Sequence, residues 1–418
     1  MRDDALSART RENLRRRDFM QCAAGAAGTA LICQMPVHAM SDRTNDHGSE
    51  PSDAITLFLC GDVMLGRGID QILAHPGDPH LYEPAVGSAT TYVELAERVS
   101  GPIPRGVGSS YVWGDALETL RHIGPDLRII NLETSITKSR EAVPKGINYK
   151  MNPENVACLI AAGIDCCVLA NNHVLDWGYP GLVETLDTLD HAGIRSAGAG
   201  RAAAQAEAPA VLEVAAKGRV LVFAFGSVTS GIPRGWAAAG NRPGVNLLDD
   251  LSNRTVARIA DRARAAERPG NLLVASIHWG GNWGYEIPAQ QTRFAHALID
   301  RAGFDVVHGH SSHHPKAIEI YRDRPILYGC GDFLNDYEGI AGYEEFRDDL
   351  VVMYLPRLAT SGGQLVDFTL IPLQIRRFRL NRASERDAAW LRDVLNRESS
   401  KFGVRVMSGE DDALAVRW

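Results

Sequence analysis

The sequence has few cysteines for disulfide bonds, no apolar run long enough for a membrane-spanning helix and no excess of basic residues for binding nucleic acid. Seven cysteines among 418 residues are too few, and odd in number, for a disulfide scaffold. The apolar stretch from Cys22 to Cys33 is shorter than the roughly 20 residues that a membrane-spanning helix needs. Because 44 Lys and Arg are outnumbered by 51 Asp and Glu, binding of nucleic acid through a basic face is disfavoured.

What is present is an ordinary globular composition, with 45% hydrophobic and 23% charged residues. At about 150 residues per domain, the length predicts two to three domains. A chain of this size buries a large core without disulfides. Five cysteines that follow the N-terminal stretch lie mostly in or beside apolar runs, and we expect them to be buried small hydrophobes: Cys60, Cys158, Cys166, Cys167 and Cys330.

The first 39 residues have the features of an export signal. Arg15, Arg16 and Arg17 precede Phe19, a short Ala- and Gly-rich stretch follows, and small residues end at Ala39. The paired arginines resemble the twin-arginine motif, so we expect export to the periplasm, with residues 40–53 as a flexible lead-in. No stable transmembrane segment is expected after signal removal. Retention of the signal as an anchor, or a basic surface helix leading into a buried one, stays open as an alternative.

Six short apolar runs, typical of buried strands, each end in a polar residue of catalytic or ligating type. Helical patterns lie between them, which predicts an α/β body over residues 54–375. In such folds, sites collect beyond the carboxyl ends of the strands. The runs and the polar residues that follow are 55–60 with Asp62, 127–130 with Asn131 and Glu133, 166–170 with Asn172 and His173, 272–277 with His278, 304–307 with His308 and His310, and 325–328 with Asp332.

After about residue 376 the chain changes character. Residues 379–401 form a charged amphipathic pattern that predicts a helix, and short β-like segments follow at 404–406 and 414–418. We therefore expect residues 376–418 to be a C-terminal helix and tail packed on the main domain.

The residues at the strand ends combine carboxylates, a carboxamide and imidazoles. Asp62, Glu133 and Asn172 supply oxygen, and His173, His278, His310 and His313 supply nitrogen. This mixture suits one or two borderline divalent ions such as Mn²⁺, Fe²⁺ or Zn²⁺, and it differs from a cysteine-rich structural zinc site.

Six motifs occur in an order that resembles the CapA family of poly-γ-glutamate capsule proteins, which belongs to the calcineurin-like metallophosphoesterase superfamily. The resemblance spans about residues 55–375 and implies a four-layer α-β-β-α sandwich of two mixed sheets, with the C-terminal helix as an appendage. The motifs are Gly-Asp-Val-Met-Leu-Gly-Arg at 61–67, Asn-Leu-Glu-Thr at 131–134, Ala-Asn-Asn-His at 170–173, His-Trp-Gly at 278–280, Gly-His-x-x-His at 309–313 and Tyr-x-x-Gly-Asp-Phe at 328–333.

The resemblance also implies roles for individual residues. Those that match metal ligands are Asp62, Glu133, Asn172, His278, His310 and His313. His173 matches the histidine that faces the substrate and protonates a leaving group, and two metals about 4 Å apart would activate a bridging water. Asp176 orients His173 or, alternatively, caps the helix that begins near Gly178.

Three positions depart from the superfamily pattern. Met64 stands where the first motif has histidine, and a thioether is a poor ligand for a hard divalent ion. Glu133 replaces the bridging aspartate, and Asp332 stands where relatives often have asparagine. The resemblance therefore leaves open whether one or two ions are held, and whether Asp332 faces the site or only ends a strand.

On the substrate side, Arg67 is expected to clamp a carboxylate or phosphate. The loops around Lys145 and Trp283 are candidates to shape the pocket, and residues 229–246 have the length and composition of a lid.

We expect a metal-assisted hydrolase or transferase that acts on poly-γ-glutamate or another anionic envelope polymer, with polymer synthase or export machinery as possible partners. The alternatives are a metal-dependent peptide epimerase and a non-catalytic export factor that binds the polymer.

Overall fold

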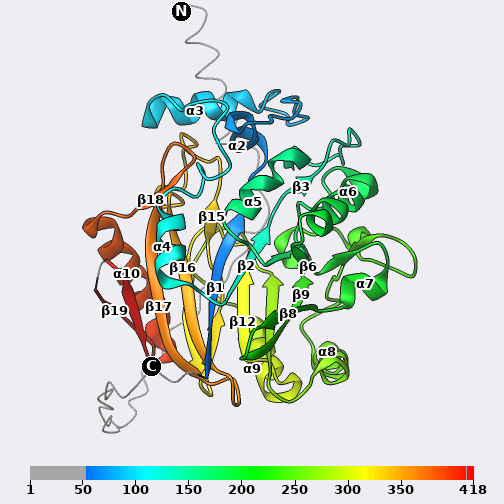
Figure 1. Ribbon diagram of the computed structural model, residues 1–418, viewed down its shortest axis with the longest axis vertical. Coiled ribbons are helices and arrows are strands. Elements are labelled where there is room, and N and C mark those ends of the chain that lie inside the picture. The colour runs from blue at the N-terminus through cyan, green and yellow to red at the C-terminus, as the bar shows by residue number, and fades with distance from the viewer. Residues whose placement is uncertain (1–52, 411) are drawn as a thin grey trace, which may run out of the picture.

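The computed structural model describes residues 53–410 and 412–418, in which strands run through the centre and most helices lie on the outside (Figure 1). The expected signal, residues 1–39, and nearly all of the lead-in lie outside the described residues. The described part is a mixed α/β structure with two large sheets. No helix within it is long and apolar enough to cross a membrane.

The first sheet has ten strands in the order β19-β20-β17-β16-β1-β2-β5-β6, with β15 paired to β1 and β18 paired to β17. One part of this sheet is parallel and consists of β15, β1, β2, β5 and β6. The other part is antiparallel: β16 pairs with β1, and β17 to β20 continue the sheet from β16. The bounds are β1 Ala54–Val63, β2 Leu127–Leu132, β5 Cys166–Val168, β6 Arg195–Ala197, β15 Asp332–Leu334, β16 Leu350–Ala359, β17 Leu365–Ile375, β18 Leu380–Arg382, β19 Arg405–Ser408 and β20 Leu414–Arg417.

The second sheet has six strands in the order β13-β14-β12-β11-β9-β8, of which β9, β11, β12 and β14 are parallel. Its bounds are β8 Ala210–Val214, β9 Gly218–Gly226, β11 Asn271–His278, β12 Val306–His310, β13 Ile318–Tyr321 and β14 Arg324–Leu327. Two short pairs complete the strands: β3 Ser135–Ile136 with β4 Lys150–Met151, and β7 Ala199–Gly200 with β10 Gly244–Val245.

The helices of the described residues connect and cover these sheets. Their bounds are α2 Arg67–Ile72, α3 Thr90–Ser100, α4 Ala116–Ile123, α5 Ala157–Ala161, α6 Gly178–His191, α7 Ala203–Glu207, α8 Asn253–Ala266, α9 Ala289–Ala302 and α10 Glu385–Ser399. Single 3-10 turns are η1 Pro153–Val156, η2 Val228–Ser230, η3 Arg234–Trp236 and η4 Ser400–Phe402.

Both faces of the central strands are buried, in separate hydrophobic clusters. Leu57 and Leu59 of β1 pack in one cluster with Val222 of β9 and Val274 of β11, so the two large sheets share this core. The alternate residues of β1, such as Phe58, point into a second cluster with helices α4 to α6. Because successive side chains of a strand point to opposite faces, a strand buried on both sides is apolar at nearly every position.

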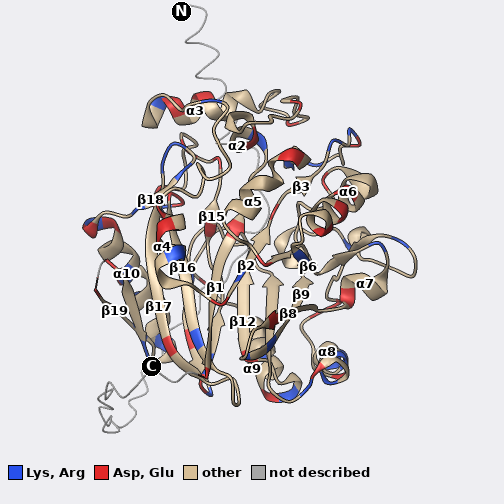
Figure 2. Ribbon diagram, viewed as in Figure 1, with Lys and Arg blue, Asp and Glu red and all other residues tan. Residues whose placement is uncertain are grey.

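A third cluster fills the outer face of the second sheet. Phe223 of β9 and Ile277 of β11 pack there against Ile259 of α8 and against Phe294 and Leu298 of α9. Figure 2 shows the consequence for charge: the central strands are mainly tan, whereas most charged residues lie on helices and loops. The five cysteines are all buried and free, as the sequence predicted.

The C-terminal segment differs in detail from the prediction. The helix begins at Glu385 rather than at residue 379, because residues 380–382 form β18 and Ser384 caps the helix by accepting a hydrogen bond from Asp387 N–H. Leu391 of α10 and Val416 of β20 belong to the core between the sheets. Residues 376–418 are therefore built into the large sheet as well as packed on it.

Candidate metal centre

Carboxylates and imidazoles meet where strands of the two sheets end. Asp62 lies near the end of β1, and His278 and His310 end the adjacent strands β11 and β12, paired in register with each other. Three ligand atoms, one from each residue, lie within 4.8 Å of one another, and all three residues are buried. Parallel strands carry their carboxyl ends to one edge of a sheet, which explains this convergence.

The distances within this first donor group are short. Asp62 Oδ1 is 4.0 Å from His278 Nδ1 and 3.8 Å from His310 Nδ1, and the two nitrogens are 2.8 Å apart. Asp62 is held by Asn131, whose Nδ2 donates to Oδ1 at 2.7 Å, and by the Ser311 N–H, which donates to Oδ2 at 3.2 Å.

A buried hydrogen-bond relay fixes which nitrogen of His310 carries its proton. His308 Nε2 donates to the Cys60 carbonyl at 2.7 Å, so its Nδ1 accepts from Ser276 Oγ at 3.1 Å. Ser276 Oγ in turn accepts from His310 Nε2 at 2.9 Å. Burial lowers the pKa of His308 to about 4 and keeps the pKa of His310 well below its usual value, so both rings are neutral. His310 Nδ1 is therefore left with a lone pair.

His278 is arranged in the same way. Its Nε2 donates to Asn172 Oδ1 at 2.9 Å, and burial holds its pKa well below the usual value. Its Nδ1 then also presents a lone pair, 2.8 Å from that of His310. Two lone pairs facing each other beside a carboxylate repel, and a cation between them removes the repulsion. The donor set thus fits a divalent metal ion.

Glu133 adds a second indication. Its Oε2 is buried and has no hydrogen-bond partner among the described residues, which is rare for a carboxylate. Burial and the neighbouring Asp62 raise its pKa well above the usual value. Its Oε1 lies 3.8 Å from both His173 Nε2 and His278 Nε2. An orphaned carboxylate oxygen beside the donor group is what a ligand lacking its ion would show.

The Nε2 atom of His173 points toward Glu133, and its Nδ1 atom contacts Asp176 and Lys145. Its Nδ1 donates to Asp176 Oδ2 at 2.6 Å, and Lys145 Nζ lies 2.7 Å from Asp176 Oδ1 and 3.3 Å from His173 Nδ1. Burial lowers the pKa of His173 to about 4, with Asp176 opposing and Lys145 reinforcing the shift. Asp176 therefore orients His173, and Trp177, not Asp176, occupies the N-cap position of α6.

Of the remaining predicted ligands, Asn172 lies close to the first donor group and His313 lies in a second one. Asn172 reaches the donors through its hydrogen bond to His278. His313 lies apart from His278 and His310, in a second group with Asp62 and Asp332, where its Nδ1 is 2.8 Å from Asp332 Oδ1.

Arg67, which was expected to clamp a substrate carboxylate or phosphate, is paired with two carboxylates of the protein itself. Its guanidinium forks onto Asp336, with Nε to Oδ2 at 3.1 Å and Nη2 to Oδ1 at 2.5 Å, and Nη1 reaches Glu83 at 3.2 Å. It also lies between the rings of Tyr92 and Tyr149, 3.8 and 4.4 Å from their centroids. Three of its five N–H groups are thus used within the protein, because Asp336, 269 residues away, and Glu83, 16 residues away, fold onto it.

A cavity of about 90 Å³ opens beside these residues. Trp283 of the predicted aromatic loop lines it, whereas Trp279 is buried and donates its Nε1–H to the Tyr328 carbonyl. Its wall also includes Asn172, His173, His313, Tyr149, Tyr337 and Tyr343. The oriented His173 and Asn172, which is hydrogen-bonded to His278 of the donor group, therefore line one aromatic-walled space.

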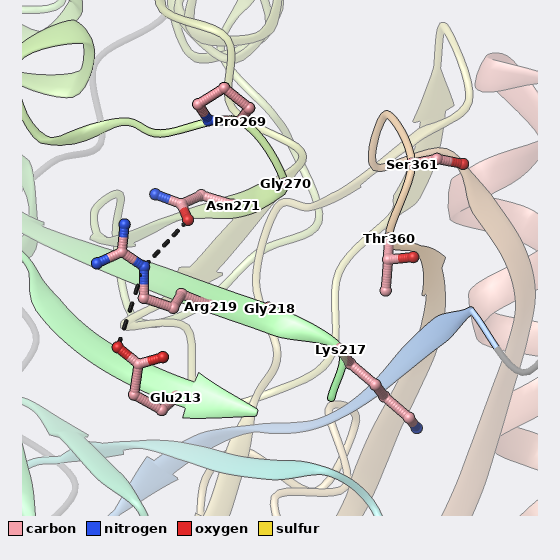
Figure 3. Close-up of a pocket in the computed structure, with 9 residues that line it drawn as sticks. All are labelled: Glu213, Lys217, Gly218, Arg219, Pro269, Gly270, Asn271, Thr360 and Ser361. Atoms are coloured by element: carbon pink, nitrogen blue, oxygen red, sulfur yellow. Dashed lines mark hydrogen bonds and ion pairs between the residues drawn. The ribbon is translucent and has the colours of Figure 1, made fainter. Parts of the chain in front are cut away.

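A larger hollow, of about 570 Å³, lies at the opposite edge, where β9 and β11 begin (Figure 3). There Arg219 Nε donates to Asn271 at 3.2 Å and lies 4.0 Å from Glu213. Within residues 53–410 and 412–418, two groups of three potential metal ligands occur, and neither includes a residue of this hollow.

The sequence analysis missed Ser276 and named His308 at a strand end without a role. Both carry the relay, and alternation along a strand gives the signal, since each lies two residues before a ligand on the same face. Lys145 was assigned to a polar loop without a partner. No sequence signal pairs it with Asp176.

The fold and the centre define an α/β protein with a candidate divalent-metal site at its strand ends. Among known families, residues 56–337 match the model of the bacterial capsule synthesis protein PGA_cap. The chain belongs to this family.

Two kinds of relatives are similar over most of the chain. A probable polyglutamine synthesis accessory protein of Mycobacterium tuberculosis is 49% identical over 366 residues, which cover 87% of this chain and 96% of that protein. The PGA biosynthesis protein CapA of Bacillus subtilis is 26% identical over 304 residues, 72% of this chain and 68% of that protein. The capsule biosynthesis protein CapA of Bacillus anthracis is 24% identical over 326 residues, 78% and 68% of the respective chains.

Proposed function

We propose that this protein is an exported, metal-dependent hydrolase or transferase in the synthesis, export or processing of poly-γ-glutamate or a related envelope polymer. The observation that carries the proposal is the pair of imidazole lone pairs, 2.8 Å apart, that face Asp62 beside an oriented His173. The names of the relatives, which refer to polyglutamine synthesis and capsule biosynthesis, support the choice of polymer.

The metal would be held by Asp62, His278 and His310, with Glu133 and Asn172 at its border. A set of imidazole and carboxylate donors favours Mn²⁺, Fe²⁺ or Zn²⁺. When bound, such an ion polarises a carbonyl or phosphoryl oxygen and lowers the pKa of a bound water.

The residues of the chain itself divide the remaining work. His173, held by Asp176, is placed to give a proton to a leaving group or take one from a nucleophile. Lys145 contacts both Asp176 and the His173 ring, and it also donates to the Asn172 carbonyl, so it helps to hold the pair in place. Since the His173 side chain lines the cavity, a substrate bond in that space lies within its reach.

Cations beside His173 and in the predicted lid support an anionic substrate. Lys145 is about a quarter exposed, and Trp236 of the predicted lid lies 5.3 Å from its ammonium group. Arg234 and Arg242 of the same segment are exposed. Because the net charge of the chain is −7, these local cations, rather than the overall charge, would attract a polyanion.

We also propose that the two sheets and their covering helices form the four-layer sandwich of the metallophosphoesterase type. The core shared by both sheets and the helix-covered outer faces support this assignment. Export through the twin-arginine route remains our proposal from Arg15 to Arg17, and synthase or export machinery would be the partner at the destination.

The test is turnover of defined poly-γ-glutamate chains by the purified protein. Activity should disappear with a chelator and return with Mn²⁺ or Zn²⁺, and His173→Ala should remove activity while the metal is retained. If the metal-loaded protein leaves the polymer intact but binds it, and a variant without Asp62 and His310 supports capsule export normally, the protein is an export factor instead.

A second candidate function is peptide epimerisation. His173 and His313 line the same cavity, and each is hydrogen-bonded to an aspartate, Asp176 and Asp332 respectively. A proton exchange at a carbon needs an acid and a base. Incubation of the polymer or of short γ-glutamyl peptides in D₂O separates the two functions. Deuterium at a Cα without bond cleavage supports epimerisation, and its absence excludes it.

A further inference from the structure

The cavity beside His173 has one arginine and one aspartate in its wall, Arg67 and Asp348. Much of the remaining wall is aromatic and includes Tyr149 and Trp283. Its volume of about 90 Å³ is well below the roughly 300 Å³ of a site that encloses a whole small ligand, so it suits one end group of a longer molecule. A cation and an anion in the wall of one small space favour an end group that carries both charges.

Arg67 keeps two N–H groups for a ligand. Asp336 and Glu83 accept three of its five N–H groups, which leaves one on each terminal nitrogen without an acceptor among the described residues. Arg67 has φ of 48°, in the left-handed region that a residue with a side chain rarely adopts. Backbone strain of this kind is typical of functional sites.

The charges around Arg67 decide what kind of carboxylate it can hold. Its two partners, Asp336 and Glu83, already outnumber its single positive charge. A further carboxylate that arrives alone would therefore gain little from the cluster. A carboxylate that brings an ammonium group on the same carbon is different, because the two charges cancel and the cavity gains no net charge.

Asp348 can receive such an ammonium group. Its carboxylate has no hydrogen bond or ion pair with another described residue. Burial raises the pKa of Asp348 to about 7, and His313, which opposes this shift, is hydrogen-bonded to Asp332 instead. A cation that enters the cavity would stabilise the ionised carboxylate, and the aromatic ring faces also attract an ammonium group.

One segment of the chain sets the positions of both residues. Residues 335–349, between β15 and β16, contain no helix or strand. Asp336, near the start of this segment, holds Arg67, and Asp348 lies near its end. Asn335 Nδ2 donates to the Asp348 carbonyl at 3.2 Å, which ties the two ends together. The arginine and the aspartate are therefore held relative to each other.

A γ-linked glutamyl chain carries the matching group at its amino end. The γ-linkage uses the side-chain carboxyl, so the first residue keeps its α-ammonium and its α-carboxylate on one carbon. An α-linked peptide loses that carboxylate to its first peptide bond, and residues inside a γ-linked chain lack the ammonium. The first amide of the γ-linked chain follows the α-carbon by two methylene groups, which would bring it close to His173 in the same cavity.

We propose that Arg67 and Asp348 form a subsite for the amino end of a γ-glutamyl chain, in which Arg67 donates to the α-carboxylate and Asp348 accepts from the α-ammonium. This inference rests on the proposed function and sharpens it. The recognised part of the polymer is its amino end rather than its middle, and γ-linked glutamate is preferred over α-linked glutamate.

The experiment compares the binding of three tri-glutamates to the purified full chain by titration calorimetry in the presence of Mn²⁺. The first is γ-linked with a free amino end, the second is its N-acetylated form, and the third is α-linked, each in the L and the D form. The first should bind about 10–100-fold more tightly than the other two, as expected for hydrogen bonds to charged groups.

Three variants assign the preference to the subsite. Asp348→Asn should lower the affinity for the free γ-linked chain to that for the N-acetylated chain, and leave the latter unchanged. Arg67→Lys keeps the positive charge but loses the planar fork, so it should remove the preference for γ-linked over α-linked chains. Asp349→Asn is the matched control, because Asp349 pairs with Arg347 outside this cavity and should keep the wild-type preference. Thermal melting of each variant shows that it is folded.

The outcomes separate this subsite from the proposed function. Equal binding of the free and the N-acetylated γ-linked chain by the wild type, or an unchanged preference in folded Asp348→Asn, overturns the subsite. The proposed function still stands in that case if the polymer is turned over. A wild type that neither binds nor turns over any γ-glutamyl chain overturns both.

Discussion

Two hollows at opposite edges of the strands differ in size and in chemistry. The one where β9 and β11 begin has about 570 Å³, and the one at the strand ends has about 90 Å³. The larger is walled by Arg219 and its ordinary surface partners (Figure 3), whereas the smaller is lined by His173 and His313, beside the buried donor groups. Volume therefore does not locate the site; strand direction does, because parallel strands bring their terminal residues together.

The largest effect is expected from removal of the Asp62 carboxylate, which both donor groups share. Asp62→Ala takes a ligand from both donor groups, so we expect a loss of metal affinity of more than about 100-fold, since even supporting residues cost about 10–100-fold. Activity should fall to background. Elemental analysis and turnover measure both. Wild-type metal content in this variant would contradict the account.

Replacing the oriented histidine tests the chemistry without the metal. His173→Ala should lower the turnover rate about 10²–10⁴-fold, the usual contribution of a general acid or base. Metal content should stay that of the wild type, because His173 belongs to neither donor group. A variant that loses its metal, or one that turns over normally, would show that His173 acts differently.

The pH dependence of metal binding follows from the carboxylate that both groups share. Burial, reinforced by Asp332, raises the pKa of Asp62 to about 7, whereas an unfolded aspartate titrates near 4. A proton on Asp62 thus stabilises the metal-free fold fully below about pH 4, and this contribution is lost as pH rises through about 7.

Metal must displace that proton, so the apparent affinity should fall about tenfold per pH unit below about pH 7. Titration calorimetry at pH 6, 7 and 8 measures the slope. Equal affinity at pH 6 and pH 8 would show that Asp62 is already ionised in the metal-free protein.

A smaller effect is expected from the relay behind His310. Ser276→Ala removes the hydroxyl that accepts the His310 proton at 2.9 Å, which frees the ring to change tautomer. Metal affinity should fall about tenfold, at the low end of what such supporting residues contribute. Ser227→Ala is a suitable control, because Ser227 Oγ bonds only within its own turn. Equal metal affinities of the two variants would show that the hydrogen bond from His310 to Ser276 does not contribute to metal binding.

The smallest effect is expected from a substitution in the larger hollow, where β9 and β11 begin. Arg219→Ala should leave metal content and turnover unchanged and alter the free energy of unfolding by no more than about 0.5 kcal/mol, as for most surface changes. Chemical denaturation and the same activity assay check this. Loss of turnover in Arg219→Ala would mean that the hollow contributes to function.

The sequence predicts much of this architecture because burial on both faces makes the central strands continuously apolar. β1, β2, β11 and β12 were all expected, together with the polar residues at their ends. The antiparallel hairpin of β16 and β17 was missed, since residues 350–375 end in no residue of ligating type and offered no comparable signal.

Contacts between residues far apart in sequence were beyond sequence reasoning. Arg67 was expected to clamp a substrate carboxylate or phosphate; it lines the cavity, and its fork holds Asp336, 269 residues away. The position of Asp332 was left open, because only the pairing of β15 with β1 brings it to Asp62. Spacing along the chain identifies which residue types are present, and strand pairing decides which of them meet.

The most direct measurement is the metal content of the purified protein compared with that of the double variant His278→Ala, His310→Ala. The account predicts at least one equivalent of a divalent transition metal in the wild type, retained through dialysis, and none at this position in the variant. A folded wild-type protein that retains no metal, or a variant that retains as much as the wild type, would contradict it.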